Sequence, residues 1–293
     1  MDTLELVFDM ETGDPDDFLT LLWLADHPRV NLRAVTVTPG SRAQIGVVRW
    51  GLRALERGEV PVGAYNLDHP KDSVSAWHYR SFGDIAPSED ARPGWELLAE
   101  QLDADATLLT GAPLKNLKIL LRDHLPEGFT LGRWVAQGGF AGDNVVAPEH
   151  RLAKFRGMTT CPTYNFNGDP KGARLALDHP AIRERRCVSK NVCHGVVYDQ
   201  EFHERVGDHR HQRASLRIIH EAMTSYLRRN KAGKKFHDPL AACCALDPSI
   251  VSWAEVELVR RGGKWGSEPK PGSNTWISVA VDQGAFAQRF TAR

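Results

Sequence analysis

Residues 4–17 of the chain read LELVFDMETGDPDD. A short apolar run, residues 4–8, is followed at once by five carboxylates in the nine residues from Asp9 to Asp17. The next apolar stretch, residues 18–25, has the spacing of a helix, so the pattern predicts a buried strand, an acidic turn and a helix. In a parallel sheet, such a turn lies at the carboxyl ends of the strands, where ligands bind.

The same alternation of strands and helices continues along the chain. Further strands are expected at residues 32–38, 60–62, 106–109 and 133–137, and helices at 42–57, 114–122 and 170–178. We therefore predict one α/β domain over residues 1–293, with a mostly parallel open sheet and helices on both faces. Two segments, at about 63–98 and 195–236, look irregular and are expected to form lids over a site.

Composition excludes several classes of protein. The chain has 293 residues, of which 42% are hydrophobic, and its 37 basic side chains balance 37 acidic ones. This composition argues against disorder, and the absence of net positive charge argues against nucleic acid as a partner. No apolar stretch reaches the length of a membrane span, and no CxxC pair occurs among the five cysteines. We expect a cytoplasmic protein with buried, reduced thiols.

The acidic turn is the strongest candidate for a site. Crowded carboxylates repel one another, and the usual remedy is a hard divalent cation, Ca²⁺ or Mg²⁺, although some of these acids also suit a helix cap. A second feature, His237-Asp238-Pro239, opens the apolar segment 240–246. Asp238 fits either a helix start or a further metal ligand, with His237 as an acid near the same cation.

These two motifs and several others resemble, in their order, those of the inosine-uridine-preferring nucleoside hydrolases. The likeness extends over nearly the whole chain. DMETGDPDD (9–17) resembles the family's DxDPGxDD with one residue inserted, TGAPLKNL (110–117) its TGPLTNL, QGG (137–139) its MGG, NFNGDP (165–170) its NxxxDP, NVCH (191–194) its NVTH, and HDP (237–239) its HDP.

The resemblance implies an N-ribohydrolase that uses one Ca²⁺ ion and acts on a nucleoside or related ribosyl compound. It also suggests a homodimer or homotetramer. The implied metal ligands are Glu11, Asp17, Asp238 and the main-chain oxygen of Thr110. Because cleavage of an N-glycosidic bond passes through an oxocarbenium-like state, a nucleophilic water must be activated and the base must be helped to depart. Glu11 is the implied general base, with Asp9 in reserve, and His237 would protonate or polarise the leaving base.

The sugar contacts follow from the same resemblance. Asp16 would bind the 2′- and 3′-hydroxyls, and Ser41, Gln137, Asn144 and Asn165 would add further contacts. The chain also departs from the family pattern. Ser41 stands where the family has an asparagine, Thr163 stands where it has a glutamate, and extra residues lie between Asn144 and Asn165. A rebuilt sugar pocket, and hence an unusual substrate, is expected.

Three other interpretations of the same residues stay open at this point. A non-catalytic protein that binds a ribosyl ligand would fit the substitutions at Ser41 and Thr163. A DEDD-type 3′–5′ exonuclease would fit the start FDMETG (8–13), but its histidine segment needs an aspartate where this chain has Ala242. A haloacid-type phosphatase, with Asp9 as the first residue of its motif, is a weaker alternative. That family prefers aspartate at the position of Glu11.

Overall fold

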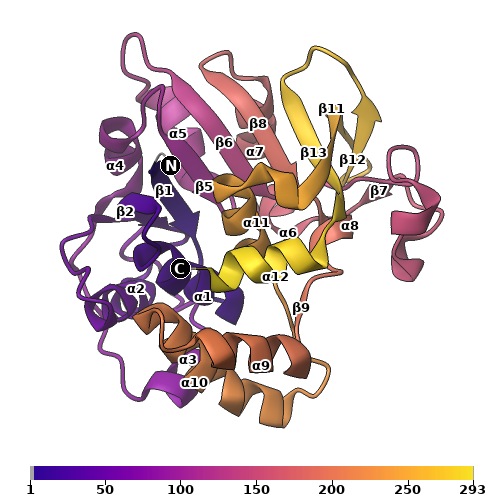
Figure 1. Cartoon of the computed structure of the whole chain (residues 1–293). Coiled ribbons are helices and arrows are strands. Elements are labelled where there is room, and N and C mark those ends of the chain that lie inside the picture. Colours follow the sequence, from indigo (N-terminus) through magenta and orange to yellow (C-terminus); the bar gives the residue numbers. More distant parts are fainter. Residues whose placement is uncertain (1–2, 293) are drawn as a thin grey trace.

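The computed structural model describes residues 3–292. Its main feature is an eleven-stranded sheet, in which eight neighbouring strands run parallel and the last three, β11, β12 and β7, are antiparallel (Figure 1). The strand order is β4 (Arg92–Pro93), β3 (Val62–Ala64), β2 (Val30–Val37), β1 (Leu4–Met10), β5 (Thr107–Thr110), β6 (Leu131–Gln137), β8 (Ile182–Val188), β13 (Thr275–Val281), β11 (Val251–Arg261), β12 (Lys264–Pro269) and β7 (Thr160–Cys161). A separate ribbon pairs β10 (Lys234–Lys235) with β9 (Val197–Tyr198).

Strand β1 lies inside the parallel region, between β2 and β5. Its alternate side chains enter two different apolar clusters: Leu6 and Phe8 belong to one, and Val7 belongs to the other. A strand that is buried on both faces needs a continuous apolar run, which explains the sequence of residues 4–8.

Helices cover both faces of the sheet, as the two clusters require. The first cluster is built with α1 (Pro15–Ala25), α2 (Arg42–Ala54), α3 (Ala76–Phe82), α8 (Lys190–Cys193), α9 (Gln200–His209), α10 (Ala214–Arg229), α11 (His237–Leu246) and α12 (Gln283–Thr291). The second is built with α4 (Gly94–Gln101), α5 (Lys115–Asp123), α6 (Tyr164–Gly168) and α7 (Pro170–Asp178). Three short 3₁₀ helices complete the list: η1 (Pro148–His150), η2 (Ala153–Phe155) and η3 (Pro248–Ile250). The predicted α/β class, with a mostly parallel sheet and helices on both faces, is confirmed.

Of the two segments predicted to be irregular, 195–236 is largely helical, so that part of the prediction is wrong, whereas 63–98 is mainly irregular outside α3 and the start of α4. Residues 63–98 contain α3 and the start of α4, and residues 195–236 contain α9 and α10. In the second segment, Phe202 and Val206 of α9 and Ile219 and Met223 of α10 are buried in the first cluster. Frequent charged and histidine residues on the outer faces hide this helical spacing in the sequence. Whether either segment moves as a lid stays a prediction.

Two further expectations concern the chain as a whole. Within residues 3–292, none of the helices combines the length and apolar character needed to cross a bilayer. All five cysteines are free and buried, as predicted.

Candidate active site

The candidate site lies at the carboxyl ends of β1, β5 and β6, where the first turns of α1 and α11 meet. Helix α1 begins at Pro15, directly after the acidic turn, and α11 begins at His237. Residues from these five elements or the turns that follow them, and from α6, line a cavity of about 340 Å³. The lining comprises Glu11, Gly13, Asp14, Asp16, Asp17, Gly111, Gln137, Tyr164, Asn165, His237 and Asp238.

Three aspartates form the centre of the site. One carboxylate oxygen from each of Asp16, Asp17 and Asp238 can be chosen so that all three lie within 4.8 Å of one another. The residues are only 1%, 2% and 5% exposed, respectively. The early acidic turn and the late His-Asp pair therefore meet in space, as the metal prediction requires.

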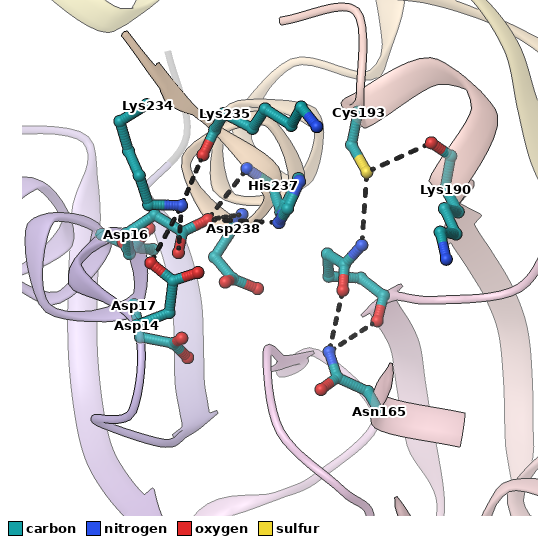
Figure 2. A network of polar contacts seen from close by, with 12 residues as sticks. Asp14, Asp16, Asp17, Asn165, Lys190, Cys193, Lys234, Lys235, His237 and Asp238 are labelled. Atoms are coloured by element: carbon teal, nitrogen blue, oxygen red, sulfur yellow. Dashed lines mark hydrogen bonds and ion pairs between the residues drawn. The ribbon is translucent and has the colours of Figure 1, made fainter. Parts of the chain in front are cut away.

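Backbone N–H groups hold this arrangement. Oδ2 of Asp16 accepts hydrogen bonds from the N–H groups of His237, at 3.0 Å, and Asp238, at 3.4 Å (Figure 2). Oδ1 of Asp17 accepts from the N–H of Glu11 at 3.2 Å. Asp16, Asp17 and Asp238 all lie in the first turn of a helix, where the helix dipole favours negative charge.

The carboxylates of this cluster repel one another, and one of their oxygens has no hydrogen-bond partner in the described residues. Burial, and then the charges of Asp238 and Glu11, raise the pKa of Asp17 well above its ordinary value. The pKa of Asp238 is raised in the same way, by burial and then by Asp16 and Asp14. Oδ1 of Asp238 is buried and has no hydrogen-bond partner among residues 3–292. Closely packed carboxylate oxygens with an unsatisfied member fit a hard divalent cation, which takes oxygen ligands.

Lys234, which sequence reasoning missed, supplies one positive charge at this cluster. Its Nζ lies 2.9 Å from Oδ1 of Asp14 and 3.2 Å from Oδ1 of Asp16, and its side chain is only 7% exposed. Burial alone would lower the pKa of this amine, but the two carboxylates raise it overall. In the sequence, Lys234 stands beside Lys235, and such a pair is typical of an exposed surface.

Glu11 and Asp9 occupy different environments. Glu11 lines the cavity, and its Oε2 accepts a hydrogen bond from the N–H of Gly13 at 2.6 Å, so its side chain folds back over its own turn. Burial, and then the charges of Asp14 and Asp16, raise its pKa to about 7. Asp9 is fully buried behind the cavity, where Oδ1 accepts from Thr36 Oγ1 at 2.6 Å and from Asn116 Nδ2 at 2.9 Å.

Gln137 and Asn165 form the opposite wall of the cavity. Nδ2 of Asn165 donates to Oε1 of Gln137 at 2.8 Å, and Nε2 of Gln137 points to Sγ of Cys193 at 3.4 Å (Figure 2). Oδ1 of Asn165 is buried without a hydrogen-bond partner in the described part of the chain, so it can accept from a ligand. Tyr164, a residue that sequence reasoning missed, is 73% exposed at the edge of the cavity.

Besides Asp9, three other predicted residues do not line this cavity within the described structure. The hydroxyl of Ser41 caps α2 and donates to the carbonyl of Asp72 at 2.5 Å, and Nδ2 of Asn144 donates to the carbonyl of Ser267 at 2.6 Å. Their local hydrogen bonds direct both side chains to other parts of the backbone. Thr110 ends β5 directly before Gly111, and its hydroxyl accepts from the indole N–H of Trp134 at 3.0 Å. Its main-chain oxygen remains the predicted ligand.

Gly111 gives a first testable prediction. A Cβ atom added here would lie 2.6 Å from Oδ1 of Asp238 and 2.9 Å from Oδ1 of Asp17. Gly111→Ala must therefore displace two buried carboxylates, and overpacking of about 1–3 kcal/mol corresponds to a loss of roughly tenfold to 100-fold in metal affinity. Calorimetric titration with calcium measures it. Gly58→Ala is the control, because its Cβ would meet only Arg53 at 3.7 Å. Equal affinities in the two variants would contradict the prediction.

The chain is similar to known proteins over most of its length. The family described as inosine-uridine preferring nucleoside hydrolase matches residues 6–288. An uncharacterized protein of Aquifex aeolicus (strain VF5) is 29% identical over 290 residues, which cover 94% of each chain. The pyrimidine-specific ribonucleoside hydrolase RihA of Shewanella sp. (strain MR-7) is 24% identical, over 86% of this chain and 82% of that protein.

Among solved structures, an inosine-guanosine nucleoside hydrolase superposes with a TM-score of 0.71. The alignment covers 98% of both chains at 16% sequence identity. At this identity the likeness is one of fold, and it extends from the first strand to the last helix.

Proposed function

Since the chain belongs to the inosine-uridine preferring nucleoside hydrolases, a family of enzymes that hydrolyse N-glycosyl bonds, we propose that it is a Ca²⁺-dependent N-ribohydrolase acting on a nucleoside or related ribosyl compound. The observation that carries the proposal is the convergence of Asp16, Asp17 and Asp238 on one buried point. We assign Asp17 and Asp238 as calcium ligands, with Glu11 and the main-chain oxygen of Thr110 completing the set.

In the proposed reaction, the calcium ion and the surrounding side chains have separate roles. When bound, calcium supplies positive charge beside the water that attacks the sugar. Glu11, at the edge of the cavity, takes the proton of that water. Asp16 accepts hydrogen bonds from the 2′- and 3′-hydroxyls, and Asn165 uses its free Oδ1 for a further sugar contact. We assign His237, at the start of α11, to the leaving base. Burial lowers its pKa to about 3, so the neutral ring polarises the base by donating a hydrogen bond.

A metal-depletion assay tests the proposal. The purified protein is stripped with EGTA and assayed for release of reducing sugar from inosine and uridine, before and after calcium is restored. We expect activity only with calcium. Ligand binding in calcium without any reducing sugar, over hours at high enzyme concentration, would instead favour a ribosyl-binding protein. Labelled single-stranded oligonucleotide serves as the control substrate, and it should remain intact.

The pH dependence of calcium binding is a further prediction. The pKa of Glu11 is raised to about 7, so the folded metal-free protein binds more protons than the unfolded chain. The free energy of unfolding of the metal-free protein should therefore fall as the pH rises toward 7. Calcium must displace these protons, so its stabilisation is largest above pH 7 and is lost as the pH falls below it.

Thermal unfolding at pH 8 and pH 5, with and without calcium, measures this effect. At a free calcium concentration about 100-fold above its Kd, the stabilisation is ~2.7 kcal/mol at the higher pH. The same calcium-dependent shift in Tm at both pH values would argue against carboxylate ligands with raised pKa values.

The cellular compartment and the oligomeric state of the protein are also proposals. Five free, buried thiols fit a reducing compartment, and we propose the cytoplasm. We also propose a homodimer or homotetramer, which light scattering coupled to size-exclusion chromatography would measure.

A further inference from the structure

Three lysines from three separate segments gather beside the cavity. Lys154 lies on η2, Lys190 begins α8, and Lys235 ends β10. They surround His194, whose Nδ1 accepts a hydrogen bond from Nζ of Lys154. Burial lowers the pKa of His194 to about 3, and the nearby charges of His237, Lys154, Lys235 and Lys190 add to this effect.

No carboxylate compensates this positive charge within the part of the chain that the structure describes. None of the three amines makes an ion pair there, and Lys190 donates to the carbonyl of Pro162 at 2.8 Å instead. Burial lowers the pKa of Lys154 to about 8, and repulsion from Lys235 and Lys190 contributes. The neighbouring Lys234 differs, because Asp14 and Asp16 neutralise it.

This lysine cluster adjoins the proposed reaction centre. The rings of His194 and His237 are stacked at a tilt, with centroids 4.9 Å apart, and His237 lines the cavity. Cys193, which contacts Gln137 of the cavity wall, also donates to the carbonyl of Lys190 at 3.7 Å. Figure 2 shows the side chain of Lys235 beside His237, and Lys190 beyond Cys193. A substrate seated over the aspartates would thus extend toward the lysines.

We propose that Lys154, Lys190 and Lys235 bind a phosphate monoester on the substrate, so that the preferred substrate is a nucleoside monophosphate. The inference rests on the proposed function. Amines that lie near one another around His194 and have no carboxylate partners in the described residues are a suitable site for a phosphate group, which offers several acceptor oxygens. In the reaction, the C1′–N bond breaks, water supplies the oxygen bonded to C1′, and a proton passes to the base. The products are a ribose phosphate and the free base.

The test compares inosine 5′-monophosphate with inosine in calcium, for the wild-type enzyme and for the variant in which Lys154, Lys190 and Lys235 are all methionine. In the wild type, kcat/KM should be at least about tenfold higher for the monophosphate, because a charge-assisted hydrogen bond contributes that much. The triple variant should lose this preference while keeping its kcat/KM for inosine. Lys231→Met, at an exposed lysine without an ion pair within residues 3–292, should change neither value.

Each other outcome has a defined meaning. Equal kcat/KM for both substrates in the wild type, unchanged in the triple variant, overturns the inference and leaves the proposed function standing. Preference for orotidine, whose carboxylate is on the base, over both compounds also overturns the phosphate assignment. If no substrate is hydrolysed, the proposed function fails. Calorimetric titration with inosine 5′-monophosphate then decides the inference, which requires binding by the wild type and none by the triple variant.

Discussion

Replacing Asp238 by alanine is expected to abolish calcium binding and to lower kcat by about 10³-fold or more. The residue contributes a buried carboxylate oxygen with no hydrogen-bond partner in residues 3–292, beside Asp17 and Asp16. Loss of the ion removes several kcal/mol of charge stabilisation in the transition state, and about 1.4 kcal/mol corresponds to a factor of ten in rate. Calorimetric titration with calcium and steady-state kinetics measure the two effects. Asp17→Ala is expected to behave in the same way.

The fold should survive this substitution. Burial, and then the charge of Asp238, raise the pKa of Asp17, so removal of Asp238 relieves repulsion in calcium-free buffer. The free energy of unfolding without calcium should therefore not fall in Asp238→Asn, which keeps the shape of the side chain. Asp208→Ala, at an exposed position of α9, is the control for the loss of an aspartate from a helix. Calcium affinity in Asp238→Ala equal to that of the wild type would remove the metal site from the proposal.

Replacing His237 by alanine is expected to lower kcat for inosine by about 10²- to 10³-fold, the usual cost of removing one hydrogen-bond donor from a group that gains charge in the transition state. Nε2 of His237 is buried and has no hydrogen-bond partner among the described residues, so it is free to serve the leaving base. Its Nδ1 lies 3.7 Å from Oδ2 of Asp16, and the ring packs beside His194. Because the side chain is not a predicted ligand, calcium affinity should not change.

A substrate with an activated leaving group provides the control for His237. A p-nitrophenyl riboside needs little help for its leaving group to depart, so its kcat should change far less than that of inosine in His237→Ala. A loss of the same size for both substrates would show that His237 positions the sugar or the ion instead. Loss of calcium binding in this variant would have the same meaning.

The parts of the fold that the sequence predicts well are those with strong local patterns. The apolar run of β1 and the helical spacing of α2, α5 and α7 give bounds within a few residues of the observed ones. Strands such as β4, β7, β9 and β10 are only two residues long, and their pairing depends on neighbours distant in the sequence. Helices α9 and α10 escape prediction because many polar and charged residues on their exposed faces mask the helical spacing of their buried residues.

The residues of the candidate site likewise differ in whether the sequence predicts them. Carboxylates that follow a strand are visible in the sequence, and the motif order brings Asp238 into the same site. Which neighbouring acid faces inward depends on where α1 begins, and only the structure shows Asp16 beside Asp17 and Asp238. Lys234 is invisible to pattern analysis because its burial comes from tertiary packing against Asp14 and Asp16.

The junction of α1 and α11 has a consequence for biosynthesis. The hydrogen bond from the N–H of His237 to Asp16 spans 221 positions of the chain. A nascent polypeptide that has not yet emerged beyond α11 holds only the amino-terminal portion of the ligand set. For the proposed metal site, ion uptake is therefore expected only after α11 has emerged from the ribosome, and the bound ion would then link the two distant regions of the chain.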